Sequence, residues 1–409
     1  MSDRSTSPIR TRRSRVRAAT ASPLLSNVVR GEMSLIGERS TCRASWRGAG
    51  RRAIGPPRAG RGASVPRPPQ SSDPSRRERA DLPAHAGGGG ASVPSVSISV
   101  VIPTYGRPAD LLRCLLALEH QQVHPREVIV VCRRHDAPTR VALERLGSSL
   151  PLTVEVIDAE CQSVAMNAGV AVATSPVVAL TDDDAAPRPT WIAGLQSHHM
   201  QPGVGAVGGR DLVHTPEGML ERTVADVGVV KWYGRRVGNH HLGTGAARDV
   251  DFLKGVNLSI RRDLWRLDER LQGTGIQMHW EMDVSLAVVG RGLRVVYDPS
   301  LIVDHYPAAR IGSLDQRTHR ARAVVRHEAH NETLAPLKWL PLPRALVTLA
   351  YDILVGRPTT PGLVRSAVAM ARGERDVARF MLAALAGRWH AVATVLCTAR
   401  DGPRSRSQP

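Results

Sequence analysis

The chain has 409 residues and a formal net charge of +18, a length that accommodates one large domain or two. Aromatic residues make up only 3% of the sequence, and no basic stripe is interleaved with them, so the composition argues against a nucleic-acid-binding protein. The five cysteines show no CxxC spacing, which argues against a disulfide framework or a zinc site and favours a reducing compartment.

Residues 1–95 are predicted to form a disordered basic tail. Roughly two thirds of the positive excess lies before Ala91, where arginine is scattered among serine, glycine, proline and alanine. Such a composition buries too little apolar surface to fold. No apolar core of about 7–15 residues follows the cationic segment 10–17, so no secretory signal is expected. No uncharged apolar stretch reaches the roughly 18 residues that span a bilayer.

From Ser97 onward, predicted strands alternate with predicted helices. The strands are short, rich in β-branched residues and typical of a buried parallel sheet, whereas the helices place leucine or alanine at helical spacing. The strands are expected at 97–103, 127–132, 152–158 and 176–181, and the helices at 109–122, 137–146 and 163–173. This order predicts a parallel sheet with right-handed crossovers, in which ligands bind beyond the carboxyl ends of the strands.

Three consecutive carboxylates, Asp182, Asp183 and Asp184, directly follow the fourth predicted strand. Their charges repel one another, so the arrangement costs stability unless a cation lies among them. Mg²⁺ and Mn²⁺ prefer oxygen ligands and are commonly held by one or two carboxylates together with substrate phosphates. The alternative is a solvated acidic turn in which an aspartate caps the next helix.

The second half of the chain contains fewer regular patterns. A helix at 190–200 and a strand at 204–208 precede a loop-rich section, and a further helix is expected at 279–292. Closing strands are expected at 293–297 and 300–303, followed by His305. Beyond residue 310 the sequence becomes helical and basic, and charged residues interrupt its two apolar segments at 340–355 and 380–397. These interruptions predict amphipathic helices that lie on a membrane surface or on the preceding domain.

Six segments occur in the order found in family 2 glycosyltransferases with the GT-A fold, and the chain resembles that family over about residues 97–310. They are VVIPTYGRP (100–108), SVAMNAGV (163–170), LTDDDAAPRPTW (180–191), GVNLSIRR (255–262), HWEMDVSL (279–286) and GLRVVYDPSLIVDH (292–305). One DxD motif is weak evidence, but six motifs in order are strong. The resemblance implies an α/β domain over 96–310 with a mostly parallel central sheet flanked by helices, and leaves 311–409 as a helical, basic region.

The resemblance also implies a reaction and a set of site residues. The reaction is transfer of a sugar from a nucleotide-diphosphate sugar to an acceptor hydroxyl, with inversion and with Mg²⁺ or Mn²⁺ as cofactor. Asp184 and His305 are implied as metal ligands, although a lone histidine is as often simply half-buried. The implied donor contacts are Pro103, Thr104, Tyr105, Arg107, Asp136, Asn167, Asp182, Asp183 and Lys254. A purely structural role at the strand end is the alternative for Asp182.

The catalytic base is assigned by the same resemblance to Glu281, with Asp283 as the alternative. Family members commonly carry Glu-Asp here, followed two residues later by another Asp, whereas this chain has Trp280-Glu281. Glu281 and Asp283 point to different faces of a helix, so both cannot reach one acceptor. A Glu can transfer a proton as an Asp does, since their reference pKa values are similar. Alternatively, these acids only cap or solvate the helix.

Two further departures leave other functions open. The end of the second strand reads Val131-Cys132-Arg133 where the family usually has a base-reading Asp, and Met166 stands where Arg is frequent. Lys231, Arg235 or Lys254 are candidates to replace that lost cation. A non-catalytic GT-A-fold binding protein is therefore one alternative. A sugar nucleotidyltransferase is the other, but PTYGRP is not the Gly-rich, Lys-bearing first loop that it needs.

The expected partners are a nucleotide-sugar donor, a glycan or lipid-linked acceptor and a membrane surface, with no nucleic acid. Segment 22–40 resembles a fragment of bacterial membrane sugar-phosphate transferases, but it is too short to carry their activity. Together with the basic C-terminal region it favours cell-envelope or exopolysaccharide synthesis. The expected location is the cytoplasm, peripheral on the inner face of the cell membrane.

Overall fold

The computed structural model describes residues 14–15, 95–215, 218–219, 223–273, 275–308, 321–374 and 376–400, and all of them belong to one compact unit. Almost all of the predicted basic tail, including segment 22–40, lies outside the described residues. Within it, Ser14–Arg15 (β1) pairs antiparallel with Leu152–Ile157 (β4).

Four parallel strands form one half of the central sheet, as the sequence predicts. They are β2 (Ile98–Thr104), β3 (Glu127–Arg133), β4 (Leu152–Ile157) and β5 (Val177–Leu180), arranged in the order β4-β3-β2-β5. The connecting helices are α2 (Pro108–Glu119), α3 (Ala137–Arg145) and α4 (Gln162–Val172). Each helix returns the chain to the start of the next strand, so the carboxyl ends of the four strands share one edge.

The other half of the sheet is mixed. Strand β12 (Leu258–Arg261) runs antiparallel to both β5 and β7 (Val204–Thr215), and β7 is parallel to β13 (Arg294–His305). The two predicted closing strands are therefore one strand with an irregularity between Asp298 and Ile302, a correction to the prediction. The short strand β6 (Ala185–Pro187) pairs with the end of β13, and the register places His305 opposite Ala185.

The remaining elements of the α/β half are short. They are α5 (Trp191–His199), the 3₁₀ turn Arg262–Leu264, α6 (Trp280–Val289), β8 (Gly218–Met219), β9 (Val229–Val230), β10 (Arg236–Val237) and β11 (Arg248–Asp249). The C-terminal region contains α7 (Arg322–Trp339), α8 (Leu342–Leu354), α9 (Leu363–Ala371) and α10 (Asp376–Arg400). The sequence predicts α8 and α10 but not α9.

Side chains alternate between the two faces of the sheet and build two hydrophobic clusters. Val101, Ile129 and Val131 point to the face covered by α4 and α6, whereas the residues adjacent to them in sequence face α2 and α5. At Gly169 in α4 a Cβ atom would lie 2.5 Å from Val101 Cγ1, so this glycine permits close packing of the helix on the sheet.

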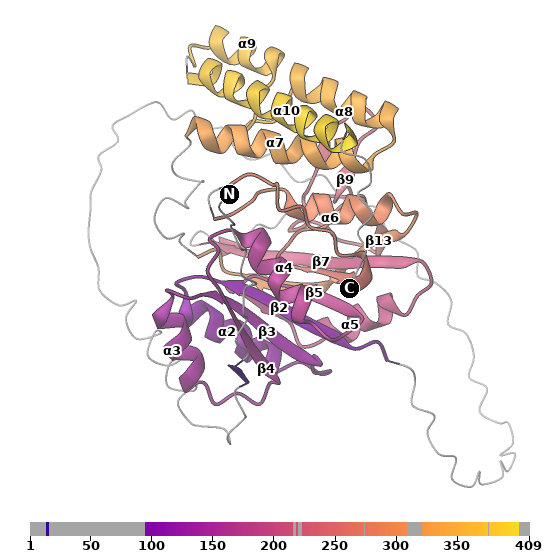
Figure 1. Ribbon diagram of the computed structural model, residues 1–409. Coiled ribbons are helices and arrows are strands. Elements are labelled where there is room, and N and C mark those ends of the chain that lie inside the picture. The colour runs from indigo at the N-terminus through magenta and orange to yellow at the C-terminus, as the bar shows by residue number, and fades with distance from the viewer. Residues whose placement is uncertain are drawn as a thin grey trace, which may run out of the picture. The chain divides into compact units, whose positions relative to one another are not determined.

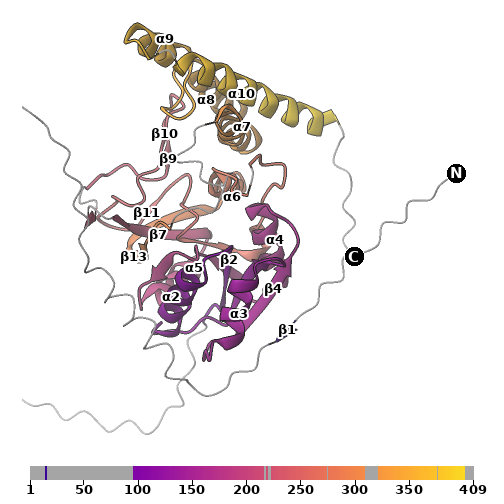
Figure 2. The same ribbon diagram turned by 90° about the vertical axis from the view of Figure 1, so that its left-hand side faces the viewer.

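The C-terminal helices form a layer on the α6 side of the sheet. Both ribbon views show α7 between α6 and the layer of α8, α9 and α10 (Figures 1 and 2). Helix α10 contains a segment, Val377–Cys397, that is long and apolar enough to cross a membrane by length and composition alone. Its Arg388 is only 1% exposed and donates hydrogen bonds to the carbonyl oxygens of Thr360 and Pro361, so this part of α10 is anchored in the protein.

Candidate active site

A cleft lies at the carboxyl ends of the four parallel strands. Its walls come from the ends of β2, β3 and β4, the start of α4, and a loop that includes Gly275 and Ile276. Pro103, Thr104, Tyr105 and Arg107 line it, as does Asp182, so these five predicted donor contacts are brought together. This is the edge at which open α/β sheets bind ligands.

The aspartate triplet is arranged around one arginine. Arg107 pairs with Asp183 at 2.8 Å and with Asp184 at 3.0 Å, and Thr104 Oγ1 donates to the second oxygen of Asp183 at 2.7 Å. Asp183 and Asp184 are buried, whereas Asp182 is partly exposed to the cleft. The three neighbouring carboxylates are therefore divided between the interior, where two contact Arg107, and the cleft, which Asp182 lines.

A second set of charges lies beyond Asp184. His305 Nε2 lies 3.4 Å from Asp184 Oδ1, and its Nδ1 lies 3.8 Å from Asp211 Oδ2. Lys254 donates a hydrogen bond to the same oxygen of Asp211, which is fully buried. The pairing of β6 with β13 brings His305 to this position, and β7 brings Asp211.

Burial and charge divide the pKa values within the triplet. Burial and the nearby Asp184 raise the pKa of Asp183 to about 7, against the opposing charge of Arg107. Burial also opposes ionisation of Asp184, but His305, the Ala308 backbone N–H and Arg107 lower its pKa to about 2. Burial disfavours a charged His305, yet Asp184 and Asp211 raise its pKa to about 9. Asp184 is thus the member of the triplet held as a carboxylate.

Asp182, Asp184 and His305 fit a divalent metal ion. Their ligand atoms all lie within 4.8 Å of one another. Asp184 Oδ1 is buried, and its contact among the described residues is the ion pair with His305 Nε2 at 3.4 Å, so an ion held by both groups would replace the imidazole proton. When His305 is neutral, as a metal ligand must be, the carboxyl groups of the triplet and Asp211 outnumber the permanent cations Arg107 and Lys254, so the group can accept a divalent cation in place of the imidazole proton. Oxygen ligands with one imidazole suit Mg²⁺ or Mn²⁺.

Glu281 lies at the start of α6 and lines a different hollow. Lys254, His240, His241 and Arg357 also line it. Lys254 joins this hollow to the aspartate cluster, because it contacts Asp211, which in turn lies beside His305. Lys254 and Asp211 therefore lie between the hollow that contains Glu281 and the group of Asp184 and His305.

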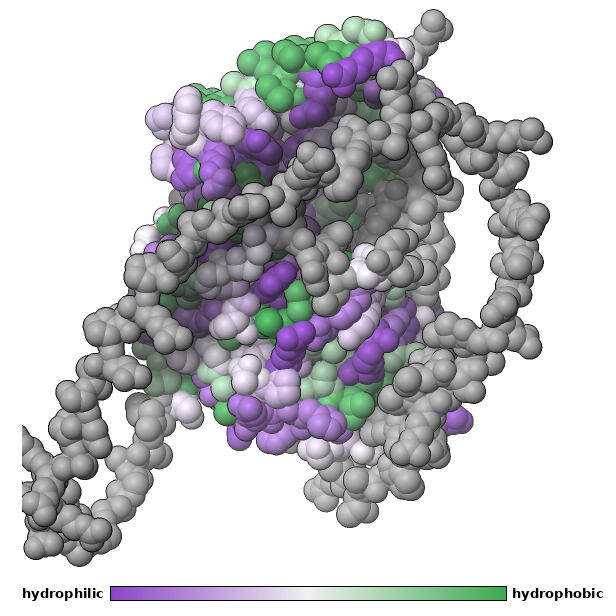
Figure 3. All heavy atoms as spheres, turned by 180° about the vertical axis from the view of Figure 1, so that it is seen from behind, coloured by the Kyte–Doolittle hydropathy of each residue, from purple (hydrophilic) through white to green (hydrophobic). Residues whose placement is uncertain are grey.

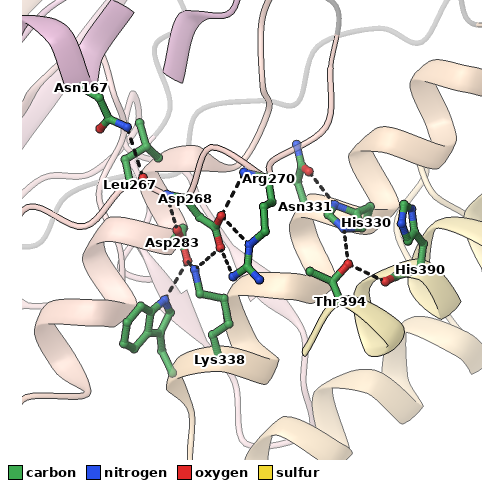
Figure 4. A network of polar contacts seen from close by, with 11 residues as sticks. Asn167, Leu267, Asp268, Arg270, Asp283, His330, Asn331, Lys338, His390 and Thr394 are labelled. Carbon is green, nitrogen blue, oxygen red and sulfur yellow. Dashed lines mark hydrogen bonds and ion pairs between the residues drawn. The ribbon is translucent and has the colours of Figure 1, made fainter. Parts of the chain in front are cut away.

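Asp283 has a different environment from Glu281. It is fully buried and accepts hydrogen bonds from Lys338 Nζ at 2.8 Å and Trp339 Nε1 at 2.7 Å. Lys338 also binds Asp268, whose carboxylate contacts Arg270 (Figure 4). Asp283 thus fastens α7 to α6 and lines neither hollow, which favours Glu281 as the base.

Two residues predicted to contact the donor, Asp136 and Asn167, instead form hydrogen bonds within the protein. Asp136 is buried, caps α3 through the Thr139 backbone N–H, and accepts from the Gly106 backbone N–H at 2.6 Å. It therefore positions the first loop, where Gly106 has φ +67°. Asn167 accepts from Trp265 Nε1 at 2.7 Å and donates to Glu269 at 2.8 Å. Neither side chain lines the cleft.

The departures from the family pattern also have structural explanations. Trp280 is buried against Gly255, where an added Cβ would lie 2.3 Å from its ring. Met166 is part of the core on the α4 side of the sheet. Among the cations proposed to replace the missing arginine, Lys231 pairs with Asp226 at 2.7 Å and Lys254 pairs with Asp211.

Sequence reasoning missed Asp211 and Arg133. Asp211 lies in the middle of a long strand, and only its pairing with Lys254 identifies it. Arg133 ends β3, lines the cleft and places its guanidinium 4.0 Å from the centre of the Tyr105 ring. Its position at a strand end, beside the absent base-reading Asp, was the available signal.

A second group with metal-competent geometry lies under the C-terminal helices. It consists of His279, Glu328 and Glu332, whose ligand atoms also lie within 4.8 Å of one another. His279 precedes α6 in the left-handed region, with φ +67°, and both glutamates belong to α7. Glu332 is fully buried and contacts Arg388 at 3.5 Å and Arg236 at 3.5 Å.

The comparisons with known proteins agree with this fold. The family model described as "Glycosyltransferase like family 2" matches residues 94–323, and with the observed sheet it confirms the predicted GT-A fold class. A search of curated proteins gave no significant match.

Three solved structures are similar in fold. A mannosyltransferase from Pyrobaculum calidifontis in complex with GDP-Man and Mn²⁺ has 16% identity and a TM-score of 0.43, over 74% of this chain and 88% of that one. GalNAc-T7 with UDP, GalNAc and Mn²⁺ has 16% identity and a TM-score of 0.44, over 66% and 59%. TarS from S. aureus with UDP-GlcNAc has 14% identity and a TM-score of 0.44, over 76% and 93%.

Proposed function

Since this chain belongs to glycosyltransferase-like family 2, we propose that it moves a sugar from a nucleotide-diphosphate sugar to an acceptor hydroxyl, with inversion at the anomeric carbon. The observation that carries the proposal is the position of the Asp182, Asp184 and His305 group. It lies at the carboxyl ends of the parallel strands, and Lys254 joins it to the hollow that contains Glu281.

The donor nucleotide is proposed to occupy the cleft. Tyr105 and Arg133 stack on one wall and offer an aromatic face and a cation. Asp136 holds the loop that carries Tyr105, through its bond to Gly106. Arg107 is held beside the aspartates and is 25% exposed, so it can turn toward a phosphate oxygen.

Mg²⁺ or Mn²⁺, held by Asp182, Asp184 and His305, would supply positive charge to the departing diphosphate. The chain supplies the remaining requirements. Asp184 stays ionised because its pKa is about 2. Lys254 and Asp211 orient His305 from the opposite side.

The acceptor is proposed to enter the hollow beside Glu281. The Glu281 carboxylate accepts the proton of the acceptor hydroxyl as the hydroxyl oxygen forms its bond to the anomeric carbon. The bond from that carbon to the diphosphate oxygen breaks in the same displacement, and the electron pair leaves with the nucleoside diphosphate. Inversion follows because the nucleophile and leaving group occupy opposite faces of the sugar.

The proposed acceptor is a glycan or a lipid-linked glycan, and the proposed role is cell-envelope or exopolysaccharide synthesis on the inner face of the cytoplasmic membrane. The cations that line the acceptor hollow, Lys254 and Arg357, support an acceptor that carries negative charge.

The test is a thermal-shift screen of nucleotide sugars with Mn²⁺ or Mg²⁺, followed by turnover of the stabilising donor. A bound donor raises the unfolding temperature by mass action. Glu281→Gln should retain this shift but lose both acceptor transfer and slow donor hydrolysis. Near-normal turnover by the variant would refute Glu281 as the base, and a wild-type protein that binds donor without any turnover would establish a non-catalytic relative.

A further inference from the structure

Hydrophobic side chains gather on one outer surface of the C-terminal region. Of the fifteen large hydrophobic residues exposed in the described part of the chain, eleven lie on α8, α9 and α10. The space-filling view shows hydrophobic atoms concentrated at the top, over these helices (Figure 3). A soluble surface rarely keeps so contiguous an apolar area without a partner.

Helix α10 shows that this exposure follows the helical repeat. Leu382, Trp389 and Leu396 are separated by seven residues each, so they lie on one face, and their exposed fractions are 63%, 73% and 57%. The opposite face of α10 carries Ala384, Ala391 and the anchored Arg388, all buried. The helix therefore packs with its small residues and presents its large ones outward.

The other two helices repeat the pattern. On α8, Leu342 and Leu346 are spaced by four residues and are 69% and 51% exposed, while Ala345, Thr348 and Asp352 are buried. On α9, Val364 and Val368 are exposed and Ser366 is buried. Three helices with buried small or polar faces and exposed apolar faces form an amphipathic layer.

Positive charge borders this layer. Residues 341–400 contain eight arginines and three acidic residues, and without the buried Arg388 and Asp352 seven arginines and two acidic residues remain. A hollow between α7 and α10 is lined by Arg322, Arg326 and Arg379 together with Leu382. Because Leu382 belongs to both the hollow and the exposed face of α10, the cations lie at the edge of the apolar surface.

We propose that the outer face of α8, α9 and α10 docks on a bilayer that contains anionic lipid, with the hollow of Arg322, Arg326 and Arg379 receiving lipid phosphate. Apolar side chains at the headgroup boundary and arginines beside them are the two features that such a surface recognises. Trp389 supplies the amphipathic ring favoured at that boundary. The chain lies on the membrane, because Arg388 and its buried partners hold α10 against α7.

Helix α8 links the docked face to the acceptor hollow, because its opposite, buried face packs on the hairpin beside that hollow. The β9–β10 hairpin packs on α8, since a Cβ at Gly234 would lie 2.7 Å from Thr348 Cα, and Arg236 binds Asp352 at 2.6 Å. Trp232 on this hairpin is 83% exposed, and Arg236 lines the hollow that contains Glu281. Docking would place that hollow close to the bilayer, although the docking proposal itself does not depend on the reaction.

The test is flotation of the full chain with vesicles of phosphatidylcholine alone or mixed equally with phosphatidylglycerol. We expect binding to the mixed vesicles that is at least tenfold stronger than to phosphatidylcholine and that weakens with salt. Trp389→Glu, and separately Arg322→Glu with Arg326→Glu, should each reduce binding at least tenfold. The matched controls, Val141→Glu and Arg145→Glu on the exposed surface of α3, should bind as the wild type does.

Other outcomes would overturn the proposal. Equal binding to both vesicle types would exclude anionic lipid, and unchanged binding of both test variants would exclude this face. A wild-type dimer that Trp389→Glu converts to a monomer, without vesicle binding, would assign the face to a second copy. Retention in membranes after alkaline carbonate extraction would show that α10 spans the bilayer. Because donor hydrolysis needs no membrane, it should be unchanged in Trp389→Glu and reports that the variant is folded.

Discussion

The two histidine-carboxylate clusters have similar geometry but differ in the number of cations around them. Around Asp184 and His305, four carboxyl groups face the two permanent cations Arg107 and Lys254. Around His279, three carboxylates, Glu328, Glu332 and Asp352, face three arginines. Both clusters contain buried polar atoms that have no hydrogen-bond partner among the described residues, so geometry alone would assign both to metals. Only in the first cluster do the carboxyl groups outnumber the permanent cations.

The second cluster is better described as a buried salt-bridge network that holds several elements together, here called the ionic fastening. Arg236 comes from the hairpin, Glu332 from α7, Asp352 from α8 and Arg388 from α10, so one buried network joins four elements. The acceptor hollow depends on it, since Arg236 and His279 also line that hollow. We therefore propose that similar residue types bind a ligand in the first cluster and hold helices together in the second.

The largest expected effect is on catalysis at the first cluster. Asp184→Asn keeps the size of the side chain but removes the ionised ligand, so metal-dependent binding of a nucleoside diphosphate should disappear and kcat/KM should fall by about 10³-fold. Calorimetry with and without Mn²⁺ measures the binding. Glu328→Gln in the second cluster is the matched control and should keep metal-dependent binding. Equal losses in the two variants would erase the distinction between the clusters.

The next largest effect is on stability at the second cluster. Glu332→Ala leaves Arg236 and Arg388 buried with one carboxylate fewer, which should lower the free energy of unfolding by about 3–5 kcal/mol. Urea unfolding of the variant and the wild type gives this difference. Adding Mn²⁺ should not change it. A loss below about 1 kcal/mol would contradict the ionic-fastening interpretation. So would a stabilisation of the wild type by Mn²⁺ that the Glu332→Ala variant lacks.

Glu281 and Asp283 lie on the same helix, α6, and test the same distinction between a role in catalysis and a role in holding the fold together. Asp283→Asn weakens the bonds to Lys338 and Trp339, so we expect a stability loss of about 1–3 kcal/mol with donor hydrolysis largely retained. Glu281→Gln should show the reverse, near-normal stability without turnover. Comparing unfolding curves and turnover for the pair decides the assignment. Loss of turnover in Asp283→Asn at wild-type stability would restore Asp283 as the base.

The parallel half of the sheet and the Asp triplet could be predicted because each depends on local sequence. The strands β2, β3, β4 and β5 are short β-branched runs, and Asp182 follows the last of them directly. The family match and the observed sheet confirm this part of the prediction. The roles of Asp184, His305 and Glu281 remain predictions that the geometry supports.

The missed residues depend on contacts between distant segments. Asp211 meets Lys254 and His305 only because β7, β12 and β13 are neighbours in the sheet, and the sequence gives no register for strands that lie so far apart. Asp283 carries no local sign that α7 will cover it, since Lys338 lies 55 residues away. Helix α9 has only nine residues, a length at which a helix is marginal in isolation, so its packing partners determine it.

The smallest expected effect is a difference in pH dependence between the two clusters. Burial raises the pKa of Asp183 to about 7, so the folded chain binds a proton that the unfolded chain has lost, and this group makes stability fall as pH rises from about 4 to 7. Burial opposes ionisation of Glu328, but His279 and Thr359 lower its pKa. Its contribution to stability is therefore present above the unfolded pKa and is lost as pH falls through the folded value.

Asp183→Asn should therefore flatten the pH dependence of the unfolding free energy between about pH 4 and 7, and Glu328→Gln should flatten it only below about pH 4.5. Urea midpoints measured across pH for both variants give the two windows. If Glu328→Gln altered the upper window instead, the carboxylates of the second cluster would be short of cations, and the charge balance that separates it from the metal-competent cluster would fail.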